Sequence, residues 1–230
     1  MIRKIYHGSD KVVRSPRFGA GSAYNDFGLG FYCTDSKERA GQWATRRGQN
    51  GFVSRYLLET DGLTVIDLMS PRYTPLNWIS VLLGYREFDT FTADAYRARD
   101  YIRTAFAVDY QGCDCMVGWR ADDVTFSYVQ DFLNGRIPYG CLCSALQECS
   151  NGRQFVLKSN RAFDKIIYDG YQAVSGAEVY PAAVAEELRA MKRYSAEIGN
   201  KVGNKADKTG ELYIGQILEE NIKPFDPRLK

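Results

Sequence analysis

Short segments in which apolar and polar residues alternate recur along the chain, and they predict β-strands. Longer segments repeat apolar residues three and four positions apart, which is the spacing of one helix face. The two kinds of segment do not alternate regularly, so the pattern predicts an α+β fold instead of a series of β-α-β units. Strands are expected over 2–6, 31–32, 52–58, 64–68, 113–118, 153–158 and 166–174. Helices are expected over 36–47, 76–86, 93–108, 122–132, 141–149 and 181–198.

The segment before the helix at 36–47 carries the most distinctive local pattern. Gly28 and Gly30 allow a tight turn and a close approach of the backbone to a ligand. Tyr32 ends the aromatic strand that follows, and Trp43 lies eleven positions further on. Two aromatic rings that face each other across a cleft suit a flat ring ligand. This pattern predicts a binding pocket.

Capping residues indicate where two helices begin. Asp35, with Glu38 three residues later, is expected to be the N-cap of the helix at 36–47. Asp122 or Asp123 is expected to cap the helix that ends near residue 132, and we interpret both in this way before any chemical role. Pro181 is expected in the first turn of the last long helix.

The 230 residues are enough for one domain with a small appendage. We expect that domain over 1–198 and a C-terminal extension over 199–230, because the composition changes there to Lys, Gly, Asn and Asp. The segment 211–222 is expected to form a terminal element that docks on the body of the protein. The chain shows neither an apolar signal segment at its start nor a stretch of membrane-spanning length, so we expect a cytoplasmic protein.

Charge and cysteine usage narrow the chemistry. The formal net charge of +2 gives no general field for a nucleic acid backbone, and the arginines at 97, 99 and 103 are interpreted as a solvated helix face. Six cysteines, at 33, 113, 115, 141, 143 and 149, are expected to be free and mostly buried. Two cysteine pairs have one intervening residue each, whereas structural zinc sites usually have two to four, so no metal site is predicted.

His7 is the only histidine of the chain, and the strand at 2–6 leads directly into it. A single histidine is more often structural than catalytic. Its position before Gly8 and Ser9, where backbone and hydroxyl groups can both donate hydrogen bonds, makes it a candidate site residue.

Three motifs together resemble a known superfamily. The strings Tyr6-His7-Gly8-Ser9 and Gly30-Phe31-Tyr32-Cys33-Thr34-Asp35, followed by Trp43, resemble the diphtheria-toxin and PARP-like branch of the ADP-ribosyltransferases. The string Asp26-Phe27-Gly28-x-Gly30-Phe31-Tyr32-x-Thr34, with Ala121-Asp122-Asp123 and Gln154-Phe155, is similar to a bacterial group long filed as a domain of unknown function. The resemblance covers residues 1 to 175.

The resemblance implies a split antiparallel β core with surrounding helices, and NAD as co-substrate in the cleft between two small sheets. By the same analogy, His7 binds the adenosine ribose, the Gly8 backbone contacts the nicotinamide amide, and Tyr32 and Trp43 enclose the nicotinamide ring. The nicotinamide of NAD is cationic, and aromatic faces attract planar cations. The NAD-binding residues implied are His7, Gly8, Ser9, Phe31, Tyr32, Thr34 and Trp43, and the catalytic ones are His7, Tyr32 and Gln154.

Gln154 departs from the superfamily pattern, which usually has a glutamate on the corresponding strand. Cleavage of the bond between nicotinamide and ribose develops positive charge on the ribose, and a glutamine can orient the ribose without balancing that charge. Another acid could take over, with Glu148, Glu178 and Asp123 as candidates. The nucleophile could instead be strong enough with orientation alone, or the domain could bind NAD without turnover.

The sequence therefore favours an NAD-dependent mono-ADP-ribosyltransferase that modifies a protein or nucleic acid, as a bacterial toxin or effector with an antitoxin or regulatory partner. The alternative is a catalytically silent NAD-binding or interaction module. A third hypothesis, a thiol enzyme that uses Cys33 with His7, conflicts with the strand pattern. Cys33 directly follows Tyr32, so its side chain is expected on the opposite face, in the core.

Overall fold

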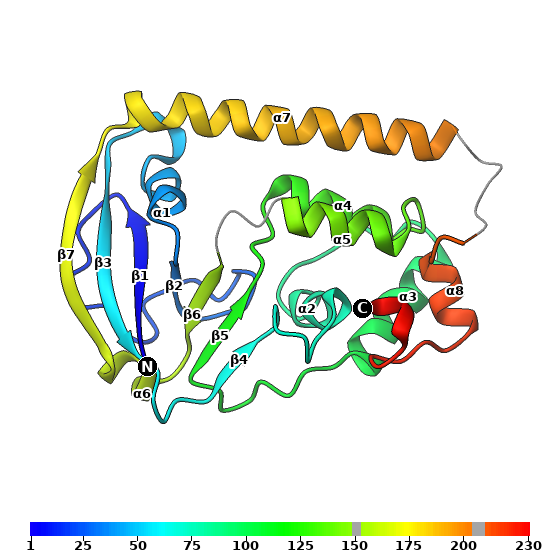
Figure 1. Ribbon diagram of the computed structural model, residues 1–230, viewed down its shortest axis with the longest axis horizontal. Coiled ribbons are helices and arrows are strands. Elements are labelled where there is room, and N and C mark those ends of the chain that lie inside the picture. Colours follow the sequence, from blue (N-terminus) through cyan, green and yellow to red (C-terminus); the bar gives the residue numbers. More distant parts are fainter. Residues whose placement is uncertain (149–152, 204–209) are drawn as a thin grey trace. The chain divides into compact units, whose positions relative to one another are not determined.

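The computed structural model describes residues 1–148, 153–203 and 210–230. The predicted α+β class is confirmed: within these residues seven strands form one sheet in the order β4-β5-β6-β2-β1-β3-β7, as Figure 1 shows together with the helices. Every strand pair is antiparallel except β4 with β5. The strands are β1 Ile2–Ser9, β2 Phe31–Thr34, β3 Gly51–Glu59, β4 Val65–Asp67, β5 Cys115–Gly118, β6 Gln154–Leu157 and β7 Ile166–Val174. The helices are α1 Lys37–Ala44, α2 Pro75–Leu82, α3 Ala93–Ala105, α4 Asp123–Leu133, α5 Tyr139–Glu148, α6 Asn160–Asp164, α7 Gly176–Gly203 and α8 Ile214–Glu219, with 3-10 turns at Arg46–Gly48 and Pro227–Leu229.

The chain divides into two compact units. The first comprises residues 1–67, 110–119 and 151–187, and it contains the whole sheet with α1 and α6. The second comprises residues 68–109, 120–150 and 188–230, and it contains α2 to α5 and α8. Helix α7 begins in the first unit and ends in the second. The domain boundary expected at residue 198 stays a prediction, and α7 continues through that position.

A narrow seam divides the sheet of the first unit. Strand β1 pairs with β3 along its full length, but it pairs with β2 at one position only, Tyr6 opposite Thr34. Strand β2 in turn pairs along its full length with β6. The sheet is therefore two small antiparallel groups, β7-β3-β1 and β2-β6-β5, joined at one point, with β4 added at the edge of the second group.

The two faces of the sheet are covered differently. One face holds the main core of the unit, and its buried members are Ile5, Cys33, Tyr56, Leu58, Cys115, Val117, Phe155, Leu157 and Ala162. On the other face, Ala40 and Ala44 of α1 pack against Val53. Gly8 makes this packing close, because a Cβ atom there would lie 1.8 Å from the Ala40 carbonyl oxygen. Helix α1 therefore rests directly on the backbone of β1.

The second unit has a separate helical core, in which Trp78, Ile102 and Phe132 are fully buried. Ile214 and Ile217 of α8 are buried, and the hydroxyl group of Tyr101 donates a hydrogen bond to the carbonyl oxygen of Ile222 (2.8 Å). Segment 211–222 thus packs within the second unit, and its expected docking on the predicted domain over 1–198 stays a prediction. Among the described residues, none of the helices combines the length and the apolar character that a membrane crossing requires.

Three local expectations are wrong, each for a physical reason. The N-cap of α1 is Ser36, whose Oγ accepts from the Arg39 amide (3.1 Å), and not Asp35. Strand β1 continues through Ser9 because β3 offers a partner at every position. Helix α7 begins at Gly176, one turn before Pro181, since the Gly176 amide is satisfied by Asn50 Oδ1 (2.9 Å). Cys149, the expected end of one helix, lies outside the described residues.

Candidate active site

His7 lies at the seam between β1 and β2. Its Nδ1 donates a hydrogen bond to the carbonyl oxygen of Tyr32 at 2.7 Å, and because that oxygen only accepts, Nδ1 carries the hydrogen. Burial lowers the pKa of His7 below its ordinary value of 6.5, and this effect outweighs the hydrogen bond to Tyr32, which favours the charged form. The imidazole is therefore neutral at pH 7, and its Nε2 is an acceptor with no protein partner among the described residues.

Phe31 supports the imidazole from the core side. The two ring centroids are 4.5 Å apart, and Phe31 makes a further edge contact with the buried Tyr56 at 5.6 Å. This position suits a residue that fixes the orientation of His7. Its predicted direct contact with NAD stays a prediction.

Tyr32 is anchored at its hydroxyl group. The hydroxyl donates to the Gly28 carbonyl oxygen (2.6 Å) and accepts from the Phe27 amide (3.0 Å). Gly28 has a φ of 70°, the left-handed conformation that glycine adopts without strain. Both hydrogen bonds lie at the tip of the side chain, so the ring is held in place through its edge.

Lys158 holds the same loop from β6, and sequence reasoning missed it. Its Nζ donates to the carbonyl oxygens of Phe27 and Leu29, the latter at 3.1 Å. Burial lowers the pKa of Lys158 below its ordinary value. The signal in the sequence is slight: a lysine directly after the buried strand Gln154–Leu157. Tyr32 and Lys158 together fix the loop that precedes β2 before any ligand binds.

Gln154 stands beside the seam, in register with Thr34 on β2, which is itself opposite Tyr6 on β1. Neighbouring strands lie about 4.8 Å apart, and residues in register point to the same face. Tyr32, two positions before Thr34, is on this face as well. The structure thus brings Gln154, Thr34 and Tyr32 together.

The side chain of Gln154 is 4% exposed, and its Oε1 has no hydrogen-bond partner in the described parts of the chain. An unsatisfied buried polar atom is unfavourable by about 1–3 kcal/mol. Thr34 differs, because its Oγ1 accepts from the Ser36 amide (3.2 Å). Gln154 is therefore the member of this group whose buried polar atom has no hydrogen-bond partner among the described residues.

Gly8 and Ser9 have structural roles of their own. Gly8 lacks room for a side chain because α1 packs on it, and the Ser9 hydroxyl donates to the Lys11 carbonyl oxygen (2.7 Å). Trp43 is half-buried on α1, the helix that covers the Gly8 face of β1. The predicted facing of Tyr32 and Trp43 across a nicotinamide ring stays a prediction.

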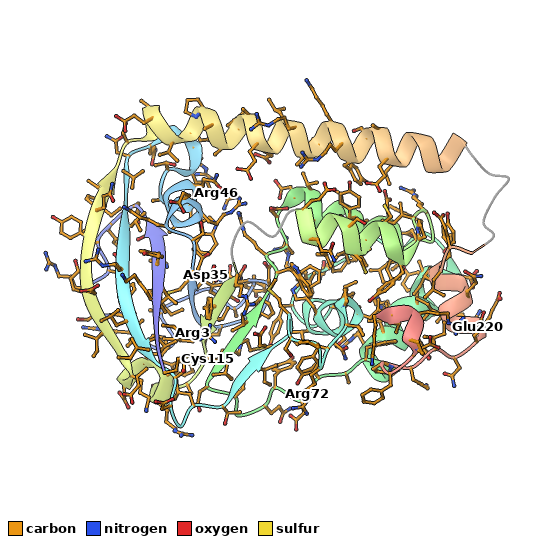
Figure 2. The ribbon with its side chains drawn as sticks, in the orientation of Figure 1. Arg3, Asp35, Arg46, Arg72, Cys115 and Glu220 are labelled. Carbon is orange, nitrogen blue, oxygen red and sulfur yellow. The ribbon has the colours of Figure 1, made fainter. Side chains whose placement is uncertain are left out.

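Carboxylates near Gln154 come from an unexpected place. Asp35 directly follows Thr34, and its Oδ1 accepts from the Arg153 amide (2.9 Å); Figure 2 labels Asp35. Asp67 forms an ion pair with the Arg153 guanidinium (3.2 Å). Both acids thus contact the residue next to Gln154, and sequence reasoning had assigned Asp35 to a helix cap.

Of the three acids proposed as substitutes, Glu178 is exposed in the first turn of α7. Asp123 and Glu148 belong to the second unit, where Glu148 forms an ion pair with Arg193 (3.6 Å). A catalytic role for any of them stays a prediction.

Cys33 is fully buried in the sheet core, and burial raises the pKa of its thiol well above the ordinary value. The expectation that Cys33 points into the core is confirmed, and a buried neutral thiol is a poor nucleophile. Within residues 1–148, 153–203 and 210–230, no three His, Cys, Asp or Glu residues are grouped so that they could hold a metal ion.

Comparison with known proteins gives one match. A family model described as "Protein of unknown function (DUF3990)" matches residues 3–168, well over half of the 230 residues. No curated protein and no solved structure matches the chain. The matched range includes β2 to β6 and all of β1 except Ile2, and with them every predicted site residue.

Proposed function

From the premise that the chain belongs to the DUF3990 family, we propose that its first unit is an ADP-ribosyltransferase-like domain that transfers ADP-ribose from NAD to a macromolecule. The residue strings around His7 and Tyr32 and their resemblance to that superfamily support the proposal. The seam between two small antiparallel strand groups supports it as well, since a cleft for NAD is expected there.

The observation that carries the proposal is the buried amide of Gln154. Its Oε1 is withheld from solvent and from protein donors among the described residues, so a ligand that donates a hydrogen bond would remove an unfavourable state. A ribose hydroxyl is such a donor. His7 offers a further acceptor, Nε2, at the same seam, and by the resemblance it serves a hydroxyl group of the adenosine ribose, the other sugar of NAD.

In the proposed reaction the bond between the nicotinamide nitrogen and C1′ of the ribose breaks, and its electron pair leaves with nicotinamide. A nucleophile of the acceptor then forms a bond to C1′ and loses its proton. By the resemblance, His7 holds the adenosine ribose and Gln154 orients the nicotinamide ribose, while Tyr32 and Trp43 position the nicotinamide ring. Positive charge develops on the ribose in the transition state, as in glycoside cleavage.

The neutral Gln154 sets the expected rate. A carboxylate about 4 Å from a unit positive charge would contribute about 4 kcal/mol at an effective dielectric constant of 20. Since 1.36 kcal/mol is a factor of ten in rate, a fixed carboxylate at this position is worth up to about 10³-fold. The proposal therefore includes slow turnover. Asp35 is the acid assigned to it, because its carboxylate accepts a hydrogen bond from the amide of Arg153, the residue before Gln154.

The test measures release of nicotinamide from NAD by the purified full chain, with and without cell lysate as a source of acceptor. Wild type is compared with His7→Ala and Gln154→Glu. Gln172→Glu, which makes the same change on the exposed face of β7, is the matched control. Release that is lost with His7→Ala and unchanged with Gln172→Glu supports the transferase. Absence of both NAD binding and release in wild type and in Gln154→Glu would overturn the proposal.

The uncharged amide at position 154 also favours a second function, a silent NAD-binding module. Such a module binds NAD saturably but releases no nicotinamide with any lysate. Release by Gln154→Glu alone would then indicate an intact cleft that lacks only the charge. The two functions thus differ in what the wild-type protein does to NAD.

A further inference from the structure

A pocket of about 410 Å³ opens in the second unit, between the loop over 86–91 and helix α3. Sites for small ligands are usually about 300–1,000 Å³, so this volume fits a ligand of nucleotide size. The pocket combines arginines with exposed aromatic rings. It lies in a unit with no assigned role, and the sequence had suggested only a solvated helix face there.

The α3 side of the pocket is a single stripe of the helix. Tyr96, Arg99 and Arg103 are spaced by three and four residues, which places them on one helix face. The Arg99 guanidinium lies 5.2 Å from the centre of the Tyr96 ring and forms an ion pair with Asp100 (3.1 Å). Arg103 is exposed and has no ion pair or side-chain hydrogen bond in the described part of the chain. Its donors are available to an anion.

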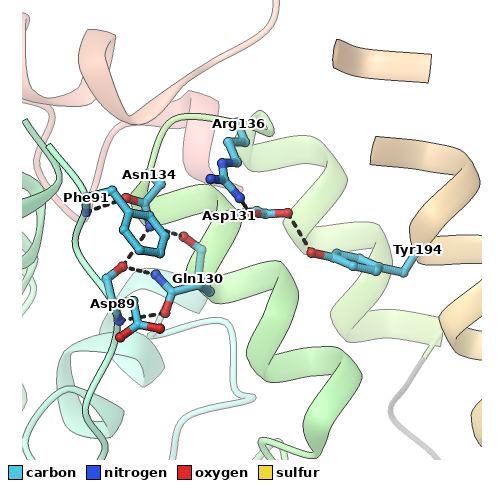
Figure 3. Close-up of polar contacts among 7 residues, drawn as sticks. All are labelled: Asp89, Phe91, Gln130, Asp131, Asn134, Arg136 and Tyr194. Atoms are coloured by element: carbon cyan, nitrogen blue, oxygen red, sulfur yellow. Dashed lines mark hydrogen bonds and ion pairs between the residues drawn. The ribbon is translucent and has the colours of Figure 1, made fainter. Parts of the chain in front are cut away.

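The opposite side is a loop that two amide side chains hold in one conformation (Figure 3). Gln130 accepts from the Asp89 amide (2.8 Å) and donates to the Asp89 carbonyl oxygen. Asn134 donates to the same carbonyl oxygen (2.9 Å) and accepts from the Phe91 amide (3.1 Å). Because one amide comes from α4 and the other from its C-cap, the loop is fixed before a ligand arrives, which lowers the entropy loss on binding.

Phe91 is 63% exposed, yet its ring is braced from within the unit. The Arg136 guanidinium lies 5.5 Å from the ring centre, and Arg136 is held by Asp131 (3.0 Å). The other oxygen of Asp131 accepts from the Tyr194 hydroxyl (2.6 Å), as Figure 3 shows. A large aromatic ring kept at the surface by such a chain of contacts is suited to stacking on another flat ring.

The charges of the lining define the ligand. Arg86, Arg99 and Arg103 face the pocket against two acids, Glu87 and Asp89. Guanidinium groups match phosphate oxygens in a bidentate manner, and aromatic faces stack on nucleobases. Carboxylates accept hydrogen bonds from the N–H groups of a base. The lining thus offers partners to the phosphate and to the base of a nucleotide.

We propose that this pocket binds a nucleotide, with its phosphate held by Arg99 and Arg103 and its base stacked on Tyr96 or Phe91. A free nucleotide and one unit of an unpaired nucleic acid strand present the same chemistry. This inference does not rest on the function proposed for the first unit, since every residue in it belongs to the second.

The experiment measures binding of two probes to the full chain at fixed salt concentration. The first is a fluorescein-labelled single-stranded RNA of about 12 nucleotides, within the usual range of strand-binding sites, followed by fluorescence anisotropy. The second is a set of nucleoside 5′-monophosphates, followed by calorimetry. Saturable binding of the monophosphates alone identifies a free nucleotide as the ligand, and much tighter binding of the RNA identifies a strand.

Arg103→Ala removes a charge-assisted contact to phosphate, and the double variant Tyr96→Ala/Phe91→Ala removes both rings on which a base can stack. Each is expected to weaken binding about fivefold or more. Arg97→Ala is the matched control, because Arg97 is on the same helix, is exposed, pairs with Asp94 and does not line the pocket. Binding that no probe saturates, or that Arg97→Ala weakens as much as Arg103→Ala, would overturn the proposal. So would loss of probe binding in His7→Ala, since the nucleotide would then occupy the first unit.

Discussion

Replacing Tyr32 by Phe isolates the role of one oxygen atom in the candidate site. The ring, and with it any stacking on a ligand, is retained. What disappears is the hydroxyl group that donates to the Gly28 carbonyl oxygen and accepts from the Phe27 amide. Each intramolecular hydrogen bond contributes about 0.5–1.5 kcal/mol net, so the loss is expected to be about 1–3 kcal/mol. The upper part of that range is favoured because Phe27 is fully buried and its amide loses its acceptor.

Two assays measure this loss of stability. Calorimetric unfolding should show a melting temperature lower by about 3–9 °C, at about 3 °C per kcal/mol for a protein of this size. Hydrogen exchange of the Phe27 amide should accelerate in the variant, because that amide donates to the Tyr32 hydroxyl. Tyr24→Phe is the control, since Tyr24 is 85% exposed and its hydroxyl forms no hydrogen bond among the described residues. A Tyr32→Phe variant that melts with the wild type, and keeps its Phe27 amide protected, would refute the anchored loop.

Three further predictions concern the same unit. Burial lowers the pKa of His7 below 6.5, so as the pH falls below 6.5 the unfolded chain binds more protons than the folded chain. The free energy of unfolding, measured by urea titration, should therefore decrease over that interval, and it should decrease less in His7→Asn. Gly8→Ala should destabilise the protein by about 1–3 kcal/mol, because the new Cβ atom would lie 1.8 Å from the Ala40 carbonyl oxygen. Gly140→Ala is the control: Gly140 is in a helix with open space around it, so this change should be neutral or stabilising in the same melting assay. Lys158→Met keeps the aliphatic chain but loses hydrogen bonds to two loop carbonyls, so it should destabilise by about 1–2 kcal/mol and raise exchange of the loop amides; unchanged exchange would show that the loop is held without it.

Sequence reasoning located the elements well because their local patterns are strong. Alternation identified strands such as β3 and β7, apolar spacing identified α2 and α3, and the capping aspartates identified the start of α4. The placement of Cys33 in the core followed from strand alternation alone. Errors arose where long-range partners override local rules, as when β3 extended β1 through Ser9.

The arrangement of the site was less accessible from the sequence. That β1 and β2 pair at a single position depends on register across the sheet, which no local motif encodes. Lys158 meets the loop before β2 across a separation of 131 residues from Phe27, and Asp35 meets Arg153 across 118. The packing reason for Gly8 likewise appears only once α1 lies on β1.

The single histidine makes one measurement decisive for the proposed NAD site. Nitrogen NMR of the imidazole observes only His7 in this chain, and it distinguishes Nδ1–H from Nε2–H. We expect the hydrogen on Nδ1 and a free acceptor at Nε2. On titration with NAD, the chemical shift of Nε2 should change until it saturates, and this change should be smaller in Gln154→Ala. An Nε2–H tautomer, or an Nε2 signal that saturating NAD leaves unchanged, would contradict a site built on the β1–β2 seam.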